Sequence, residues 1–557
     1  MCYFLNTVKR TRSFRSTIKQ AVQRIPISCY VLALFAILTA VAARNVLANL
    51  NTLAVGWDFD VYINPWADWW TVQAWRDPEV SLWYSDMIFY PQGAGMAYHS
   101  FSHYHTALSL ALRPFLGTLP AYNLVVLSNY ALTGLAMFHL GRYLTGSSMA
   151  GLIAGVVLAF NSHNLYQSSH PVLLGIWCIP WATMFLMRAV REDSPKYAAV
   201  TALFVFSAAL VGTIMFIVTT MWVALLLAYF YLATTWPRPS LRVLAVLGGL
   251  SALLVLPVEM PLLMNVLGNR DTSFVRNYQE AITLDILSPF LPHWFLWRSW
   301  TFYFGIIPLS FLMVARRHGR ETWLWYGVLI GLYIFAIGPR PSLLFQEIDV
   351  TLPWSIPITT FLRNPYRLSI LMSLALAVLA AYGWLALSKH IRPERGRVIA
   401  AVMALLIYGE YTAPAFPWVV VQVSPFYTEF LADVPDDVAL ATLPTGQTAG
   451  KVHLYYQTLH GHPITNGHVS RESDEVFTFI RGNAILRAGM DDWPAVPLPA
   501  DVDTPLRALA EVGVGYLVID KKLMKEDMVQ QWRALLQREA VYEDEWVVVY
   551  GTGGRKN

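Results

Sequence analysis

The feature that most constrains this chain is the recurrence of long apolar runs along most of its length. Runs of about 17–23 residues are long enough to cross the roughly 30 Å of hydrocarbon in a bilayer as helices. Only 14% of the 557 residues are charged, whereas a typical soluble domain carries about 25%. The sequence therefore predicts an α-helical polytopic membrane protein.

About eleven membrane-spanning helices are expected. The candidate segments are 26–46, 120–142, 147–162, 171–191, 196–213, 214–235, 240–263, 301–316, 321–338, 366–388 and 397–414. The first run ends in "AVAA", so a cleaved signal peptide is an alternative to an uncleaved anchor. We favour the anchor, and in both cases the next segment starts outside.

Basic residues concentrate in the short loops on one side of the predicted spans and in the N-terminal tail. In the loops they are Arg142, Arg188, Arg191, Lys196, Arg238, Arg242, Arg316, Arg317, Arg320, Lys389, Arg392, Arg395 and Arg397. Lys and Arg collect in cytoplasmic loops, so the N-terminus is predicted to be cytoplasmic in a plasma-membrane protein. An odd number of spans then places the C-terminus outside.

Three regions follow from this topology: a basic cytoplasmic tail (1–25), a transmembrane domain (26–423) with a long first outer loop (47–119), and an extracytoplasmic domain (424–557). In the last region, strand-like runs such as "DVALATLP", "GYLVID" and "EWVVVYG" alternate with helix-like runs, which predicts a small α/β fold. Within the first loop, "HTALSLALRPFLG" (105–117) is too short to span and is expected to form an interfacial or re-entrant helix.

Two carboxylates lie directly after the first span, in "GWDFDVYINPWADWW". Asp58 and Asp60 can converge on one cation, or one can act as general base while the other orients it. The low dielectric near the membrane would strengthen their electrostatic effects. The alternative is a turn that only caps a helix. The surrounding tryptophans fit either stacking on a sugar or an aromatic belt at the membrane surface.

The segment "FLRNPYRLSILM" is the most distinctive basic feature on the outer side. Arg363 and Arg367 flank Tyr366 there, at the start of a span. Guanidinium groups bind phosphate oxygens in bidentate fashion, so these residues are candidates for a phosphate site. Snorkelling toward the membrane surface is the alternative.

Further polar side chains on the same side are candidates for contacts with a sugar or an acceptor. They are His99, His103, Asn161, His163, His170, Gln457, His460 and Arg471. Their imidazole and amide groups are suited to hydroxyl partners. Their spacing defines no metal site, and a divalent metal ion near the carboxylates is left open.

Taken together, these segments resemble the GT-C-type polytopic membrane glycosyltransferases. The resemblance covers nearly the whole chain and rests on the long acidic first loop and on five motifs. These are the "YPQG" stretch, "AYNLVVLSNYALTGLAMFHLGRYLTGS", "AGLIAGVVLAFNSHNLYQSSH", "RNPYR" and "YYQTLHGHPITNGHVSR".

The resemblance implies a function as well as a fold. A hexosyl or pentosyl group would pass from a polyprenyl-phosphate-linked donor to an acceptor on the outer face. Asp58 or Asp60 would be the general base, and Arg363, Arg367 and Tyr366 would hold the donor phosphate. The implied partners are this donor and the lipid bilayer, with no nucleic acid.

Two other classes stay open. A non-enzymatic accessory or assembly subunit would keep the spans and the outer domain without a donor site. A transporter would show internal repeats and ionisable residues at mid-membrane depth, and no convincing repeat is visible.

Overall fold

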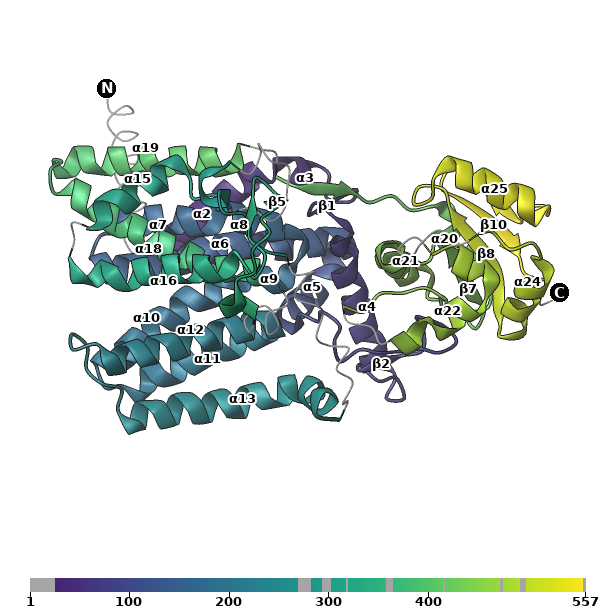
Figure 1. Cartoon of the computed structure of the whole chain (residues 1–557), viewed down its shortest axis with the longest axis horizontal. Coiled ribbons are helices and arrows are strands. Elements are labelled where there is room, and N and C mark those ends of the chain that lie inside the picture. Colours follow the sequence, from purple (N-terminus) through teal and green to yellow (C-terminus); the bar gives the residue numbers. More distant parts are fainter. Residues whose placement is uncertain are drawn as a thin grey trace, which may run out of the picture.

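The computed structural model describes residues 26–268, 282–292, 302–316, 319–356, 364–413, 416–470, 474–490 and 497–553. Figure 1 shows a bundle of long helices joined to a smaller part that contains the sheet. Each segment predicted to span contains a helix. These helices are α2 (Ile27–Ala42), α6 (Thr118–Thr145), α7 (Ser148–Phe160), α10 (Cys178–Arg191), α11 (Pro195–Val211), α12 (Thr213–Leu232), α13 (Leu241–Gly268), α15 (Ile306–Ala315), α16 (Trp323–Ala336), α18 (Ser369–Ser388) and α19 (Pro393–Thr412).

Six helical segments in the described part are long and apolar enough to cross a membrane. They are Thr118–Thr145, Ser148–Ser169, Pro171–Arg191, Thr213–Leu232, Leu241–Gly268 and Pro365–Ser388. Shorter apolar helices cover Ile27–Ala42, Pro195–Val211, Ile306–Ala315 and Trp323–Ala336. The chain is thus a multi-pass membrane protein, while the number of about eleven spans and the orientation of the termini stay predictions.

Helix α18 is the centre of the bundle. Its residues from Ser369 to Trp384 are all buried, and α7, α15 and α16 pack against it. Helix α15 lies tightly against α18 at Gly383, where a Cβ atom would overlap the backbone of Phe311. Small residues let membrane helices approach in this way. The packing fixes the N-terminal end of α18, beside which the candidate site lies.

The first loop is anchored to the bundle at its start. Strand β1 (Leu53–Val55) pairs antiparallel with β6 (Trp418–Val420), which follows α19. The Asn123 side chain of α6 accepts a hydrogen bond from the N–H of Val55 (2.8 Å) and donates one to the carbonyl of Leu53 (2.7 Å). The loop continues through η1 (Phe59–Tyr62), α4 (Ile63–Arg76), β2 (Tyr84–Ser85), β3 (Ala94–Gly95) and α5 (His103–Leu116). The helix expected at 105–117 is therefore present as α5.

Residues 424–553, called the C-terminal part below, contain a four-stranded sheet in the order β7-β8-β10-β9. Its strands are β7 (Ala439–Leu443), β8 (Val514–Asp520), β9 (Tyr542–Glu543) and β10 (Val547–Gly551). Strands β7 and β8 are parallel, and the other pairs are antiparallel. The main helices are α21 (Gln447–His460), α24 (Asp503–Glu511) and α25 (Glu526–Leu536).

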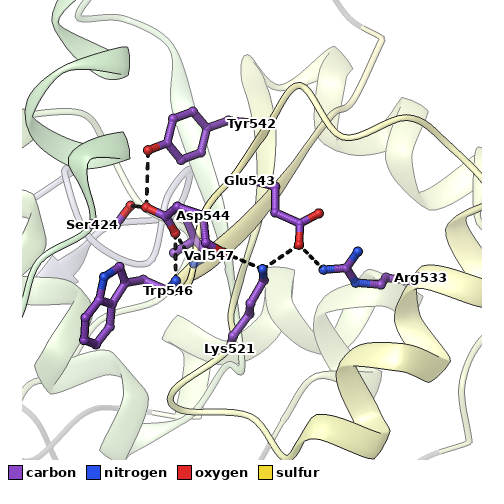
Figure 2. Close-up of polar contacts among 8 residues, drawn as sticks. All are labelled: Ser424, Lys521, Arg533, Tyr542, Glu543, Asp544, Trp546 and Val547. Carbon is purple, nitrogen blue, oxygen red and sulfur yellow. Dashed lines mark hydrogen bonds and ion pairs between the residues drawn. The ribbon is translucent and has the colours of Figure 1, made fainter.

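A polar network ties the entry of the C-terminal part to its last hairpin (Figure 2). Ser424 Oγ donates to Asp544 Oδ2 at 2.5 Å. The other carboxylate oxygen of Asp544 accepts from the N–H groups of Trp546 and Val547, each at 2.8 Å. Lys521 Nζ lies 2.6 Å from Glu543. Asp544 caps the turn between β9 and β10 and also binds Ser424. The β9–β10 hairpin therefore fixes the position at which the chain enters the C-terminal part.

The first loop and the C-terminal part share one hydrophobic core. Trp66 and Trp70 stack at 5.8 Å between ring centroids, and both are fully buried among side chains of the C-terminal part. The Trp66 indole N–H donates to Gln457 Oε1 of α21 at 2.7 Å. The proposals of sugar stacking and of a membrane-surface belt are wrong for these two tryptophans, because neither ring reaches solvent or lipid. Trp75 is 71% exposed.

Candidate functional site

The two carboxylates lie on a short loop that is fixed against the end of a helical segment. Asp58 is the N-cap of η1, and its Oδ1 accepts from the N–H of Asp60 at 3.0 Å. The N–H of Trp57 donates to Ser169 Oγ (2.8 Å). Gly56, at φ +144°, has no room for a Cβ atom because Val61 and Ser169 lie against it. Asp58 therefore caps the start of η1, and the same cap places Asp60.

Asp60 is paired with two cationic side chains from distant segments. The Oδ2 atom lies 2.5 Å from Nε2 of His170, which stands between η2 (Gln167–Ser169) and α9 (Pro171–Leu174). The Oδ1 atom forms an ion pair with Nζ of Lys451, on α21 of the C-terminal part. Three separate parts of the chain therefore meet at one carboxylate.

The surroundings shift the pKa values of the two carboxyl groups in opposite directions. Burial raises the pKa of Asp58, and the neighbouring charge of Asp60 raises it further. Burial alone would raise the pKa of Asp60, but His170 and Lys451 outweigh burial and hold it well below its usual range. Burial would lower the pKa of His170, but Asp60 and Asp58 raise it above its ordinary value. The surroundings therefore favour the ionised form of Asp60 and the protonated form of Asp58.

The predicted phosphate-binding segment lies at the same place. Pro365 begins the short helix η10 (Pro365–Leu368), a position that suits proline. Tyr366 is buried, and the side chains of Arg367 and Gln167 lie beside its hydroxyl. The guanidinium of Arg367 is near enough to His170 for its charge to oppose protonation of the imidazole. Arg363 lies outside the described residues.

Two imidazoles beside this segment carry buried nitrogen atoms with no partner among the described residues. They are Nε2 of His163, whose ring centroid lies 6.2 Å from that of Tyr366, and Nδ1 of His170. Leaving a buried polar atom unpaired costs about 1–3 kcal/mol. Both atoms are available to a bound polar ligand.

The other candidate contacts that the structure describes pack against neighbours elsewhere in the fold, although both ring nitrogens of His99 have no hydrogen-bond partner among the described residues. His99 is buried with its ring 5.3 Å from that of Trp66, and burial lowers its pKa to about 3. His103 stacks on Phe101, and Asn161 caps α8 (Ser162–Tyr166). Gln457 donates to the carbonyls of Met87 and His462, and His460 stacks on Tyr427. Arg471 lies outside the described residues.

Three of the site's side chains lie close enough together to be considered as ligands of a divalent metal ion. Asp58, Asp60 and His170 each offer one ligand atom, and these atoms lie within 4.8 Å of one another. However, both oxygens of Asp60 already face a cation, since one pairs with His170 and the other with Lys451. An ion would have to displace the lysine. Asp58, Asp60 and His170 therefore form a possible metal site among the described residues, in which an ion would replace Lys451 as a partner of Asp60.

Lys451 is the site residue that sequence reasoning missed. It lies in "LPTGQTAGKVHLYY", where β7 ends, a turn containing Gly446 follows and α21 begins. A strand, a glycine turn and an early lysine on a helix form a pattern that can carry an anion site. The pattern could have marked Lys451, but only the folded chain shows that it meets Asp60.

No family model and no curated protein sequence matches the chain. Its structure is similar to that of the arabinofuranosyltransferase AftD from Mycobacteria, with a TM-score of 0.57 and 18% identity over 88% of this chain. A structure of an AftD mutant gives a TM-score of 0.59 at 15% identity over 95% of this chain. The chain spans 35% and 41% of the length of these two AftD chains.

A second similar structure has nearly the same extent as this chain. It is ArnT from Cupriavidus metallidurans bound to undecaprenyl phosphate, with a TM-score of 0.52 and 12% identity over 94% of this chain and 97% of that chain. These solved structures bear out the fold that the sequence resemblance implied. The chain therefore shares the fold of AftD and ArnT.

Proposed function

We propose that this protein is a membrane glycosyltransferase that moves a sugar from a polyprenyl-phosphate-linked donor to an acceptor hydroxyl on the outer face of the membrane. One observation carries the proposal: on this fold Asp60, next to Asp58, pairs with the cationic side chains of His170 and Lys451 from two distant segments. The ArnT structure named above holds undecaprenyl phosphate, which supports a lipid phosphate as part of the donor.

The reaction needs a base for the acceptor hydroxyl and a partner for the departing phosphate. Asp58 is suited to the first task, because a raised carboxyl pKa makes a stronger base when the group is ionised. Its deprotonated form takes the hydroxyl proton as the oxygen attacks the sugar carbon. The bond from that carbon to the phosphate oxygen breaks, and its electron pair leaves with polyprenyl phosphate. A single displacement of this kind inverts the configuration of the sugar carbon.

The second task falls to the cationic side. Arg367, beside Tyr366, would hold the phosphate oxygens, and negative charge grows there as the bond breaks. Arg363 is proposed as a second contact. Asp60 would act through its partners, since it aligns His170 and Lys451 beside the reacting centre.

The orientation of the chain in the membrane is part of the proposal. With the N-terminus in the cytoplasm, the first loop and the C-terminal part lie outside, where both form the site. The clustering of basic residues in the opposite loops supports this orientation.

Purified protein in lipid nanodiscs tests the function. Each polyprenyl-phosphate hexose or pentose of a panel is added, and release of polyprenyl phosphate is measured with and without a sugar acceptor. Asp58→Asn should lower transfer by about 100-fold or more, because general-base catalysis contributes that much, while polyprenyl-phosphate binding is kept. The matched control is Asp86→Asn, an exposed carboxylate of the same loop.

Two outcomes would contradict the proposal. If the parent protein binds no polyprenyl phosphate and consumes no donor of the panel, an accessory-subunit role replaces the enzyme. If a chelator abolishes transfer and added divalent metal restores it, the metal-free assignment of Asp60 is wrong.

A further inference from the structure

In the scheme above, one contact between the C-terminal part and the first loop only aligns a side chain. Lys451 reaches Asp60 from α21, and its side chain is only 22% exposed. The helix is held there by several contacts. Tyr455 packs on Tyr62 at 5.4 Å between ring centroids, and Gln457 binds Trp66. The packing of α21 against η1 and α4 thus determines the position of Lys451.

The glycine beside Lys451 sets how closely α21 approaches its neighbour. A Cβ atom at Gly450 would overlap the carbonyl oxygen of Gly467. Gly467 in turn lies against Ile88 and Phe89 of the first loop. The first half of α21 is therefore wedged between the rest of the C-terminal part and the first loop, and the Lys451 backbone has little freedom.

More positive charge lies around Asp60 than is needed to balance its single negative charge. Among the described residues, Lys451 and His170 pair with Asp60, and Arg367 lies near enough to His170 to act on its charge. When Asp58 holds its proton and His170 is protonated, three positive charges face one negative charge. Like charges at this separation repel, and an anion placed among them relieves the repulsion. The unpartnered buried Nδ1 of His170 also marks a place for a polar ligand.

We propose that Lys451 is a ligand of the donor phosphate, held on Asp60 until the donor binds, so that the C-terminal part completes the donor site. The inference rests on the proposed function and adds a residue to it. A lysine ammonium is a compact charge on a flexible stem. It can turn from the Asp60 carboxylate to a phosphate oxygen while α21 stays in place. The phosphate then pairs with a cation from the C-terminal part and with Arg367 from the bundle.

The probe for this role is polyprenyl phosphate itself, with the polyprenol of the same length as an uncharged reference. Lys451→Met should weaken polyprenyl-phosphate binding by about tenfold or more, the usual effect of losing a charged hydrogen bond. Polyprenol binding should stay unchanged. Lys451→Arg should recover part of the loss. The matched control is Lys522→Met, since Lys522 lies over the ring of Trp546 in the same part of the chain.

A double variant separates a phosphate ligand from a residue that only neutralises Asp60. If Lys451 merely balances the carboxylate, then Asp60→Asn combined with Lys451→Met should restore phosphate binding. If Lys451 contacts the phosphate, the double variant should bind as weakly as Lys451→Met alone. Rescue in the double variant, or parent-like binding by Lys451→Met, overturns the role of Lys451 and leaves the proposed function standing. Failure of the parent protein to bind polyprenyl phosphate overturns both.

Discussion

The Nε2 atom of His170 lies 2.5 Å from Oδ2 of Asp60. The pair joins the first loop to the turn before α9, and so holds together the two segments that carry the acidic and the basic sides of the candidate site. Both side chains of the pair are partly buried. The stability that this ion pair contributes therefore depends on pH, and the pH range can be derived and measured.

The first prediction concerns that window. The depressed pKa of Asp60 gives stability that is present above about pH 4 and is lost as the pH falls through its folded pKa. The raised pKa of His170 gives stability that is complete below about pH 6.5 and is lost as the pH rises through its folded pKa. His170→Gln should thus destabilise the protein by about 2 kcal/mol at pH 5 and by clearly less at pH 9. Thermal unfolding at both pH values measures this, with the exposed His390→Gln as control. An equal loss at both pH values would contradict the ion pair.

The second prediction concerns Asp520, at the end of β8. Burial raises the pKa of this carboxyl to about 6, so its folded form holds a proton that the unfolded form has already lost between about pH 4 and 6. Stability falls as the pH rises through that interval. Asn keeps the oxygen that accepts from the N–H groups of Lys522 and Leu523. Asp520→Asn should therefore stabilise the C-terminal part by about 2 kcal/mol at pH 8 and change little at pH 4. Urea unfolding followed by tryptophan fluorescence gives both values, and a variant less stable at pH 8 would refute the assignment.

The third prediction concerns the attachment of the first loop to α21. Gln457→Leu leaves the buried Trp66 N–H and the His462 carbonyl without the partner that Gln457 supplies, while the Met87 carbonyl keeps the N–H of Ile464. Each buried unpaired group costs about 1–3 kcal/mol, so the midpoint of unfolding should drop and limited proteolysis should cut the first loop faster. Gln530→Leu, on the exposed side of α25, is the control and should behave as the parent does. Unchanged proteolysis of the Gln457 variant would show that the loop is held by other contacts.

The fourth prediction uses Gly450 to move Lys451 without removing it. Gly450→Ala pushes α21 away from the Gly467 carbonyl, which should weaken polyprenyl-phosphate binding while the lysine is still present. Gly482→Ala adds the same methyl group where nothing lies within 4 Å and should leave binding unchanged. Isothermal titration with polyprenyl phosphate measures both variants. Equal affinity of the two would mean that the position of α21 does not matter to the donor.

The fifth prediction concerns orientation. A phosphatase that is active only outside the cytoplasm, fused after residue 553, should be active, because the C-terminal part is proposed to lie outside. The same enzyme fused before α2 should be inactive. The reversed pattern would invert the topology and move the proposed reaction to the cytoplasmic face.

The sequence by itself determined which segments become membrane helices and where the carboxylates stand relative to the first span. Hydropathy and residue period are local properties, and helix formation in a bilayer follows from them because every backbone group must be satisfied within its own segment. The same local patterns predicted α5 and the strands β7, β8 and β10. They also pointed to Asp60, His170, Tyr366 and Arg367 as candidates.

Only the tertiary structure decided which of those candidates come together. Lys451 and Asp60 are far apart in the chain, and their contact depends on how α21 docks along η1. Gln457, His460 and Trp66 carry polar and aromatic groups as suitable as those of the site, yet packing places them in buried contacts of the first loop and the C-terminal part. The split between the two carboxyl pKa values has the same origin, because burial and the charges of His170 and Lys451 are properties of neighbours in space, and the order of residues does not specify them.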